Sequence, residues 1–241
     1  MDIRSLTEFI ESDGFAVVPD AVDAGTVTAL ISALGDAADA PSARRREGVY
    51  AIRNLLEIVP VVAALAASPQ MRALVTPVLG PEPFAVRGIL FDKTPDANWN
   101  VAWHQDLSIA VREREEVPGF GPWSEKAGVA HVQPPPAILE QMLTVRLHLD
   151  DCDETNGPLR VLPGSHREGR LTPEGIGQWR ERVRAVTCPA PSGGALLMRP
   201  LLLHASSASL SPRHRRVVHL EYAAGPLPGG LKWHYGGEAE A

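Results

Sequence analysis

Apolar residues recur at helical spacing through the first third of the chain. Ser5-Leu6-Thr7-Glu8 has the form of a capping box, which satisfies the first backbone N–H groups of a helix. Asp23 can cap a second helix, and its apolar face would consist of Val27, Leu30, Ile31 and Leu34. Ser68-Pro69 has the cap-then-proline order that begins a third helix, while residues 15–19 form a short apolar strand candidate. We therefore expect residues 1–80 to be a helical support region.

From residue 84 onward the pattern changes to short apolar or alternating runs bounded by turn residues. The predicted strands cover 84–91, 101–108, 142–150, 160–162, 195–203 and 216–222. Many strands without regular intervening helices favour a mainly β fold, a sandwich or jelly roll with the N-terminal helices covering one sheet. We expect a single domain over 1–241, with its core over 84–222.

Two segments break this pattern. Residues 37–48 are small, polar and basic, and we expect them to form a mobile loop. Residues 109–140 contain five prolines and three glycines, and a structureless stretch of this length in a compact domain is usually functional. Because the second segment directly follows the metal-ligand pair described below, we predict that it forms a lid.

Composition and charge narrow the class of protein. The chain has 241 residues and a formal charge of −6, which argues against a general nucleic-acid or anionic-membrane binder. Cys152 and Cys188 form neither a disulfide framework nor a zinc motif. No secretory signal is apparent, and the most apolar run, 58–67, is far short of the roughly 20 residues of a membrane helix. We expect a cytoplasmic protein with a small-molecule substrate, and the sequence leaves its oligomeric state open.

The segment Trp103-His104-Gln105-Asp106 carries the most specific chemistry. Residues two apart on a strand point to the same face, so His104 and Asp106 can bind one divalent metal. A second histidine would complete the two-histidine, one-carboxylate triad of non-haem Fe(II) oxygenases. Gln105, between them, points the other way and could reach the substrate.

His204 is the best candidate among eight histidines for the third ligand. It ends the apolar run 195–203, so a buried strand would deliver it to a sheet edge, and the small residues 205–209 leave room beside it. Arg215 opens the next strand eleven residues later. If these strands are antiparallel neighbours, both side chains lie near one pocket, where a guanidinium is suited to hold a carboxylate.

Taken in order, four blocks of the sequence resemble the phytanoyl-CoA dioxygenase family of Fe(II)/2-oxoglutarate oxygenases. They are 12–19 (SDGFAVVP), 103–106 (WHQD), 156–166 (NGPLRVLPGSH) and the pair His204 and Arg215. The resemblance implies a double-stranded β-helix, the cupin-like jelly roll, preceded by helices. It further implies that His104, Asp106 and His204 bind Fe(II) and that Arg215 binds the distal carboxylate of 2-oxoglutarate.

Three protein ligands leave iron three open positions, two for a chelating 2-oxo acid and one for O2. Decarboxylation of 2-oxoglutarate to succinate would then be coupled to oxidation of an unactivated C–H bond. Related halogenases have a small residue in place of Asp106, so the carboxylate favours hydroxylation, although desaturation, epimerisation and cyclisation stay open. The alternative from another class is a cupin-like isomerase or small-molecule sensor that consumes no O2.

Alternation along 215–222 leaves the choice between Arg215 and Arg216 open. One face carries Arg215, Val217, His219 and Glu221, and the other Arg216, Val218, Leu220 and Tyr222. Hydrophobicity alone would bury the second face. In a jelly roll, however, that face could lie beneath the N-terminal helices while the polar face lines the barrel, and the family spacing selects Arg215.

Four further residues are candidates for the same interior. Thr144, Arg146 and His148 share one face of a strand, which is either a solvated face at a sheet edge or a polar barrel lining. In the second case, Thr144 and Arg146 would meet the co-substrate and His148 the substrate. Lys93 stands where the family has a strand residue near the co-substrate, although an isolated lysine is more often exposed.

Overall fold

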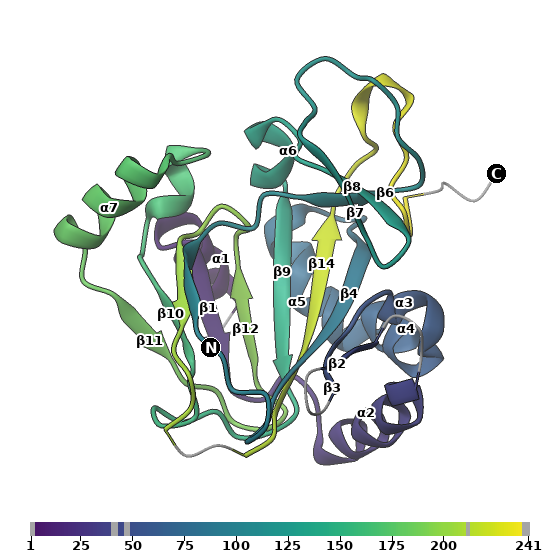
Figure 1. The fold of residues 1–241 in the computed structure, drawn as a ribbon, viewed down its shortest axis with the longest axis vertical. Coiled ribbons are helices and arrows are strands. Elements are labelled where there is room, and N and C mark those ends of the chain that lie inside the picture. The colour runs from purple at the N-terminus through teal and green to yellow at the C-terminus, as the bar shows by residue number, and fades with distance from the viewer. Residues whose placement is uncertain (1–2, 40–42, 46–48, 211–212, 238–241) are drawn as a thin grey trace.

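The computed structural model describes residues 3–39, 43–45, 49–210 and 213–237 (Figure 1). The α-helices in these parts are α1 (Ile3–Ser12), α2 (Ala24–Asp36), α3 (Leu55–Ile58), α4 (Pro60–Ala66), α5 (Pro69–Leu79), α6 (Pro136–Glu140) and α7 (Pro173–Arg182). The short 3-10 helices are η1 (Ala37–Asp39), η2 (Ser165–Glu168) and η3 (Pro228–Gly230). Asp23 caps α2 through Thr26 N, and Ser68 caps α5 through Met71 N, as the sequence predicts.

Antiparallel sheets make up the rest of the fold. The main sheet has the order β1 (Phe15–Val18), β12 (Ala195–Met198), β9 (Met142–His148), β14 (Arg215–Ala223), β4 (Phe84–Lys93), β3 (Val49–Ile52) and β2 (Ala43–Arg45). The second sheet has the order β11 (Val186–Cys188), β10 (Leu159–Val161), β13 (His204–Ser206) and β5 (Val101–His104). These two sheets form the expected cupin-like jelly-roll core.

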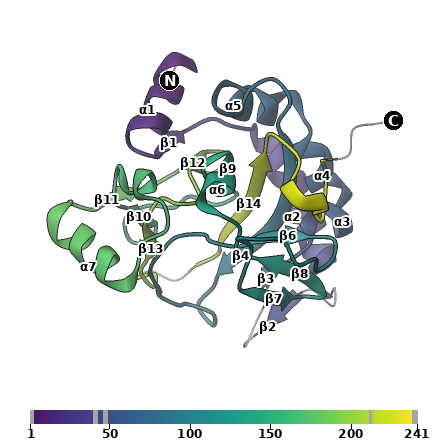
Figure 2. The same cartoon turned by 90° about the horizontal axis from the view of Figure 1, so that it is seen from above.

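The apolar face of the main sheet lies beneath the N-terminal helices, as Figure 2 shows for α1 and α5. Val145, Leu147 and Leu220 pack there against apolar side chains of the helices, and Tyr222 Oη donates to Ala66 O at 3.0 Å. Each such buried side chain contributes about 1.5–3 kcal/mol. The opposite, polar face is therefore turned toward the second sheet, which confirms the prediction of a polar barrel interior.

β9 is a central strand between β12 and β14, and all seven of its residues are buried. The interpretation of its polar face as a solvated sheet edge is therefore wrong. Strands β1, β2 and β3 also join the main sheet, so the first 80 residues are not purely helical support. Of the loop expected over 37–48, η1 and β2 are structured, and 40–42 and 46–48 lie outside the described residues.

The predicted strand over 195–203 is interrupted. β12 ends at Met198, Leu202 N donates to Arg199 O in a turn, and β13 starts at His204 in the other sheet. Pro200 explains the break, because it lacks the N–H that a continuing ladder needs. β13 pairs with β10 and β5, so the condition that the strands of His204 and Arg215 are neighbours is not met.

The segment 109–140 is more ordered than the sequence suggested. It contains α6 and a third sheet with the order β6 (Ile109–Val111), β8 (Val129–Val132) and β7 (Trp123–Lys126). Its apolar side packs against the C-terminal segment, where Val111 forms a bridge to Trp233. Whether it acts as a lid stays a prediction.

The sequence blocks 12–19 and 156–166 pack against each other, and the second block binds the backbone directly before His204. Gly164 N donates to Asp13 O at 2.9 Å, and Gly14, at φ 86°, lies against the ring of His166. Ser165 Oγ accepts from Leu203 N at 2.9 Å, directly before His204. These blocks therefore help to hold the backbone of His204 in position.

Among the described residues no single helix is both long and apolar enough to cross a membrane. One bent pair, α4 with α5, passes that test on length and composition alone, and it packs its apolar residues in the core.

Candidate metal centre

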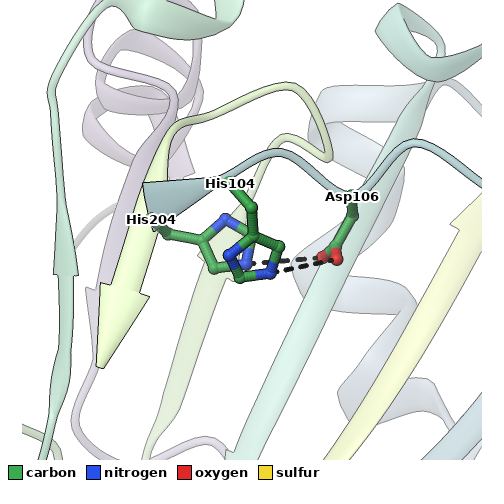
Figure 3. A group of neighbouring side chains, drawn as sticks. All are labelled: His104, Asp106 and His204. Atoms are coloured by element: carbon green, nitrogen blue, oxygen red, sulfur yellow. Dashed lines mark ion pairs between the residues drawn. The ribbon is translucent and has the colours of Figure 1, made fainter. Parts of the chain in front are cut away.

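His104, Asp106 and His204 converge between the two sheets of the jelly roll (Figure 3). His104 on β5 lies opposite His204 on β13, and their ring centroids are 4.2 Å apart. The Nε2 atoms of His104 and His204 lie 3.8 and 3.7 Å from the Asp106 carboxylate oxygens. One ligand atom from each residue falls within 4.8 Å of the others, which is close enough for one ion to touch all three.

Matching hydrogen bonds orient the two imidazoles. The Nδ1 of His104 donates to Ala102 O at 2.8 Å, and the Nδ1 of His204 donates to Leu202 O at 2.9 Å. A carbonyl oxygen can only accept, so the proton of each neutral ring is on Nδ1 and the lone pair is on Nε2. Both lone pairs are directed toward Asp106, as metal-binding histidines require.

Protonation states also suit a cation. Burial lowers the pKa of His204 to about 4, so the ring is neutral at neutral pH. Burial alone would raise the pKa of Asp106, but His204, His219 and Arg87 hold that pKa well below its ordinary value. Its Oδ2 is shielded from solvent and accepts no hydrogen bond from the described residues. A carboxylate oxygen shielded from water is costly unless a cation or a donor satisfies it, so the donor set fits a divalent metal.

Gln105 has a different position from the one expected. Its Nε2 donates to Gly169 O and Leu201 O, both at 2.7 Å, and its Oε1 accepts from Leu171 N at 2.8 Å. The side chain is buried with these three partners and does not line the cavity. The prediction of a substrate contact is therefore wrong. Gln105 instead joins the His104–Asp106 segment by hydrogen bonds to residues 169–171 and to Leu201, three residues before His204.

A cavity of about 230 Å³ adjoins the triad. It is lined by Arg53, Arg87, Ile89, Phe91, Trp99, Val101, His104, Asp106, Ser108, Lys126, Arg146, Leu159, His204, Ser206, Arg215 and His219. Arg215 is only 3% exposed and donates through Nη1 to Gly157 O. Arg216 is on the opposite face, where Nε and Nη2 bind the Asp150 carboxylate at 2.9 and 2.6 Å. Of the two arginines, Arg215 alone reaches the cavity.

Lys93 lies opposite Arg215 in the register of β4 and β14 but is not among the lining residues. Its ammonium donates to Ser206 Oγ at 3.1 Å and to Ser207 O. Burial and the nearby Arg215 lower the pKa of Lys93 to about 7. Lys93 therefore holds the end of the strand that carries His204, and its ammonium adds positive charge near Arg215.

The polar face of β9 contributes one residue to the cavity wall. Arg146 lines it, and its Nη1 is 2.8 Å from His219 Nδ1. Thr144 and His148 are buried on the same face without lining the cavity. Burial, followed by the charges of Arg146 and Arg215, lowers the pKa of His148 to about 3, so this histidine is neutral.

Sequence reasoning placed His219 and Glu221 on the polar face of their strand but missed their partners, and it missed Arg87 and Lys126. His219 Nε2 lies 3.1 Å from Glu221 Oε1, and Glu221 also pairs with Arg87. Lys126 reaches the cavity from β7, where its ammonium donates to Ser108 Oγ at 2.8 Å. Alternation places Arg87 on the face of Lys93, but nothing local indicates that it meets Glu221, 134 residues away.

Comparison with known proteins agrees with this geometry. The family model for phytanoyl-CoA dioxygenase (PhyH) matches residues 10–217. An ectoine dioxygenase of Bordetella bronchiseptica is 22% identical, over 88% of this chain and 72% of the relative. An L-proline trans-4-hydroxylase of Streptomyces griseoviridis is 25% identical, over 76% of this chain and 71% of the relative. The crystal structure of EctD from S. alaskensis with 2-oxoglutarate and 5-hydroxyectoine is similar in fold, with a TM-score of 0.72 and 22% identity over 93% of this chain and 76% of that one.

Proposed function

This chain belongs to the phytanoyl-CoA dioxygenase (PhyH) family, and we propose that it is an Fe(II)- and 2-oxoglutarate-dependent dioxygenase that hydroxylates a small-molecule metabolite. One observation carries the proposal: two imidazoles and a carboxylate face one point in a cavity that also contains Arg215. The relatives named dioxygenase and hydroxylase support an oxidation rather than an isomerase or sensor function. We assign the whole chain, 1–241, to one dioxygenase domain.

His104, Asp106 and His204 would hold Fe(II), which when bound supplies O2 activation coupled to decarboxylation of 2-oxoglutarate to succinate. Arg215 would hold the distal carboxylate of 2-oxoglutarate, because a guanidinium matches a carboxylate with two hydrogen bonds. Arg146 would add a second positive charge to the co-substrate side. Lys93 and Thr144 would act without lining the cavity, the first by binding the Ser206 hydroxyl and the Ser207 carbonyl oxygen.

The cavity favours a small substrate. Its volume of about 230 Å³ is below the roughly 300–1,000 Å³ of typical ligand pockets. Co-substrate and substrate must share this space. This limit favours a compact metabolite, and the relatives are named for two small molecules, ectoine and proline.

The first test is anaerobic. Protein mixed with Fe(II) and 2-oxoglutarate should develop the weak visible charge-transfer band of a chelated 2-oxo acid, and addition of O2 should release succinate. His204→Ala should show neither signal, while Arg216→Met should keep both. Metal binding without the band and without succinate would instead favour the isomerase or sensor alternative.

The second test addresses the type of oxidation. Candidate metabolites are scored by stimulated succinate release, and their products are analysed by mass spectrometry. Hydroxylation adds one oxygen atom to the substrate, desaturation or ring closure removes two hydrogens, and epimerisation leaves the mass unchanged. A product without added oxygen would overturn the hydroxylase assignment and retain the dioxygenase class.

A further inference from the structure

The cavity beside the metal centre carries an excess of positive charge. Its lining includes the cations Arg53, Arg87, Lys126, Arg146 and Arg215. Asp106 is the one carboxylate among the lining residues that the structure describes. Glu221, behind the wall, pairs with Arg87 and offsets one cation. A divalent metal and a doubly charged 2-oxoglutarate would cancel each other, so loading the site would leave this excess in place.

Two of these cations, Arg215 and Arg87, lie toward opposite ends of β14. Arg215 begins the strand, whereas Arg87 lies opposite Glu221, six residues further along. Six residues of antiparallel strand span roughly 20 Å, which is much longer than one 2-oxoglutarate. His104, Asp106 and His204 line the same cavity as both of these arginines. A co-substrate held at Arg215 therefore leaves the Arg87 end available for another ligand.

Lys126 reaches the Arg87 end from the hairpin of β7 and β8, within the predicted lid segment. Its ammonium donates to Ser108, two residues after the candidate ligand Asp106. Burial, and then the like charges of Arg87 and Arg53, lower the pKa of Lys126 to about 8. At this end of the cavity Glu221 pairs with Arg87, whereas Lys126 donates to a neutral hydroxyl. A bound anion would relieve the repulsion between these two cations.

We propose that the substrate is an organic anion, a carboxylate or a phosphate monoester, whose charged group binds between Arg87 and Lys126 with Arg53 beside them. This inference rests on the proposed dioxygenase function and specifies its substrate class. The anion is held at the far end of the cavity, so the C–H bond to be oxidised is presented toward the triad. Because Lys126 lies on the hairpin of β7 and β8, an anion bound to its ammonium would also hold this hairpin against the cavity.

The test compares matched ligand pairs that differ in charge. The probes are L-proline with L-prolinamide, benzoate with benzamide, and glycerol 3-phosphate with glycerol. Binding is measured by saturation-transfer NMR on protein loaded with Zn(II) and saturating 2-oxoglutarate, so that no turnover is needed. We expect at least one acid to bind tenfold or more tightly than its neutral partner, and to weaken as salt is raised. If the ratio of acid to neutral affinity is larger for the two carboxylate pairs, the site prefers a carboxylate. If it is larger for glycerol 3-phosphate, the site prefers a phosphate.

Lys126→Gln should weaken binding of that acid at least tenfold, equivalent to ~1.4 kcal/mol. The exposed Lys232→Gln is the matched control and should bind as the wild type does. Arg87→Met is a second variant, although its pairing with Glu221 makes misfolding a risk that Lys126→Gln avoids. Equal binding of acids and neutral partners, no acid binding at all, or an unchanged affinity in Lys126→Gln would each overturn the proposal.

The two proposals fail separately. If the anaerobic charge-transfer band forms while neutral ligands bind as well as acids, the anion inference fails and the dioxygenase assignment stands. If acids bind in a Lys126-dependent way but the band and succinate are absent, the dioxygenase assignment fails instead.

Discussion

Gln105 offers the sharpest test of how the fold holds the metal ligands in place. Its side-chain amide binds Gly169 O, Leu201 O and Leu171 N, and it lies between His104 and Asp106 in the sequence. Gln105→Leu keeps the approximate size of the side chain and removes all three hydrogen bonds. The backbone groups left behind are buried or partly buried, so they would lose their partner without full access to water.

The expected magnitude follows from these bonds. Each intramolecular hydrogen bond contributes a net 0.5–1.5 kcal/mol, about 1 on average, and a stranded buried partner costs more. The loss of three bonds should therefore lower the free energy of unfolding by about 3 kcal/mol. For a chain of this length, that corresponds to a Tm decrease of roughly 6–12 °C. Because the two ligand segments are no longer tied together, the Kd for metal should rise about 10- to 100-fold.

Urea unfolding of the metal-free protein measures the stability, and titration with Zn(II) or anaerobic Fe(II) measures the metal affinity. Gln178→Leu, on the exposed side of α7, is the matched control and should change neither quantity. If Gln105→Leu unfolds at the wild-type urea concentration and binds metal with the wild-type Kd, then Gln105 does not position the ligands and our reasoning is refuted.

Three further predictions concern the arginines, the third ligand and one turn. Arg215→Met should raise the Kd for 2-oxoglutarate about 100-fold, measured by the charge-transfer band, while Arg216→Met should leave it within about twofold and cost only about 1 kcal/mol of stability; the reverse pattern would reassign the carboxylate site. His204→Ala should abolish stoichiometric iron binding in elemental analysis with an unchanged circular dichroism spectrum, and retained iron would remove His204 from the triad. Gly14→Ala should destabilise the protein by about 1–3 kcal/mol in thermal unfolding, because φ is +86° and the added Cβ would lie 2.5 Å from His166 Nδ1; an unchanged Tm would contradict this.

Alternation along single strands was the most informative local signal. It correctly separated the two faces of β14, with Arg215, His219 and Glu221 on one side and Val218 and Leu220 on the other. Whether a polar face meets solvent or a barrel interior depends on what covers the apolar face, and the N-terminal helices decide that here. Local pattern therefore grouped the right residues but could not say where the group would lie.

The environment of His204 shows the limit of that approach. The apolar run 195–203 resembles one strand, yet it divides between two sheets at Pro200. The chain crosses from the main sheet to the second sheet there, so His204 meets His104 rather than the strand of Arg215. His204 was selected for partly the wrong geometric reason, and the ordered family blocks supplied what the spacing lacked.

The sequence by itself determined the candidate metal ligands, the faces of the strands, two helix caps and the family resemblance. These depend on residue identity and on the two-residue or 3.6-residue repeat of the backbone, which are local properties. Only the tertiary structure decided that Gln105 supports the ligands, that Arg87 meets Glu221, and that Lys126 completes a cationic end of the cavity. Those contacts join segments far apart in the chain, and their formation depends on the packing of all the sheets together.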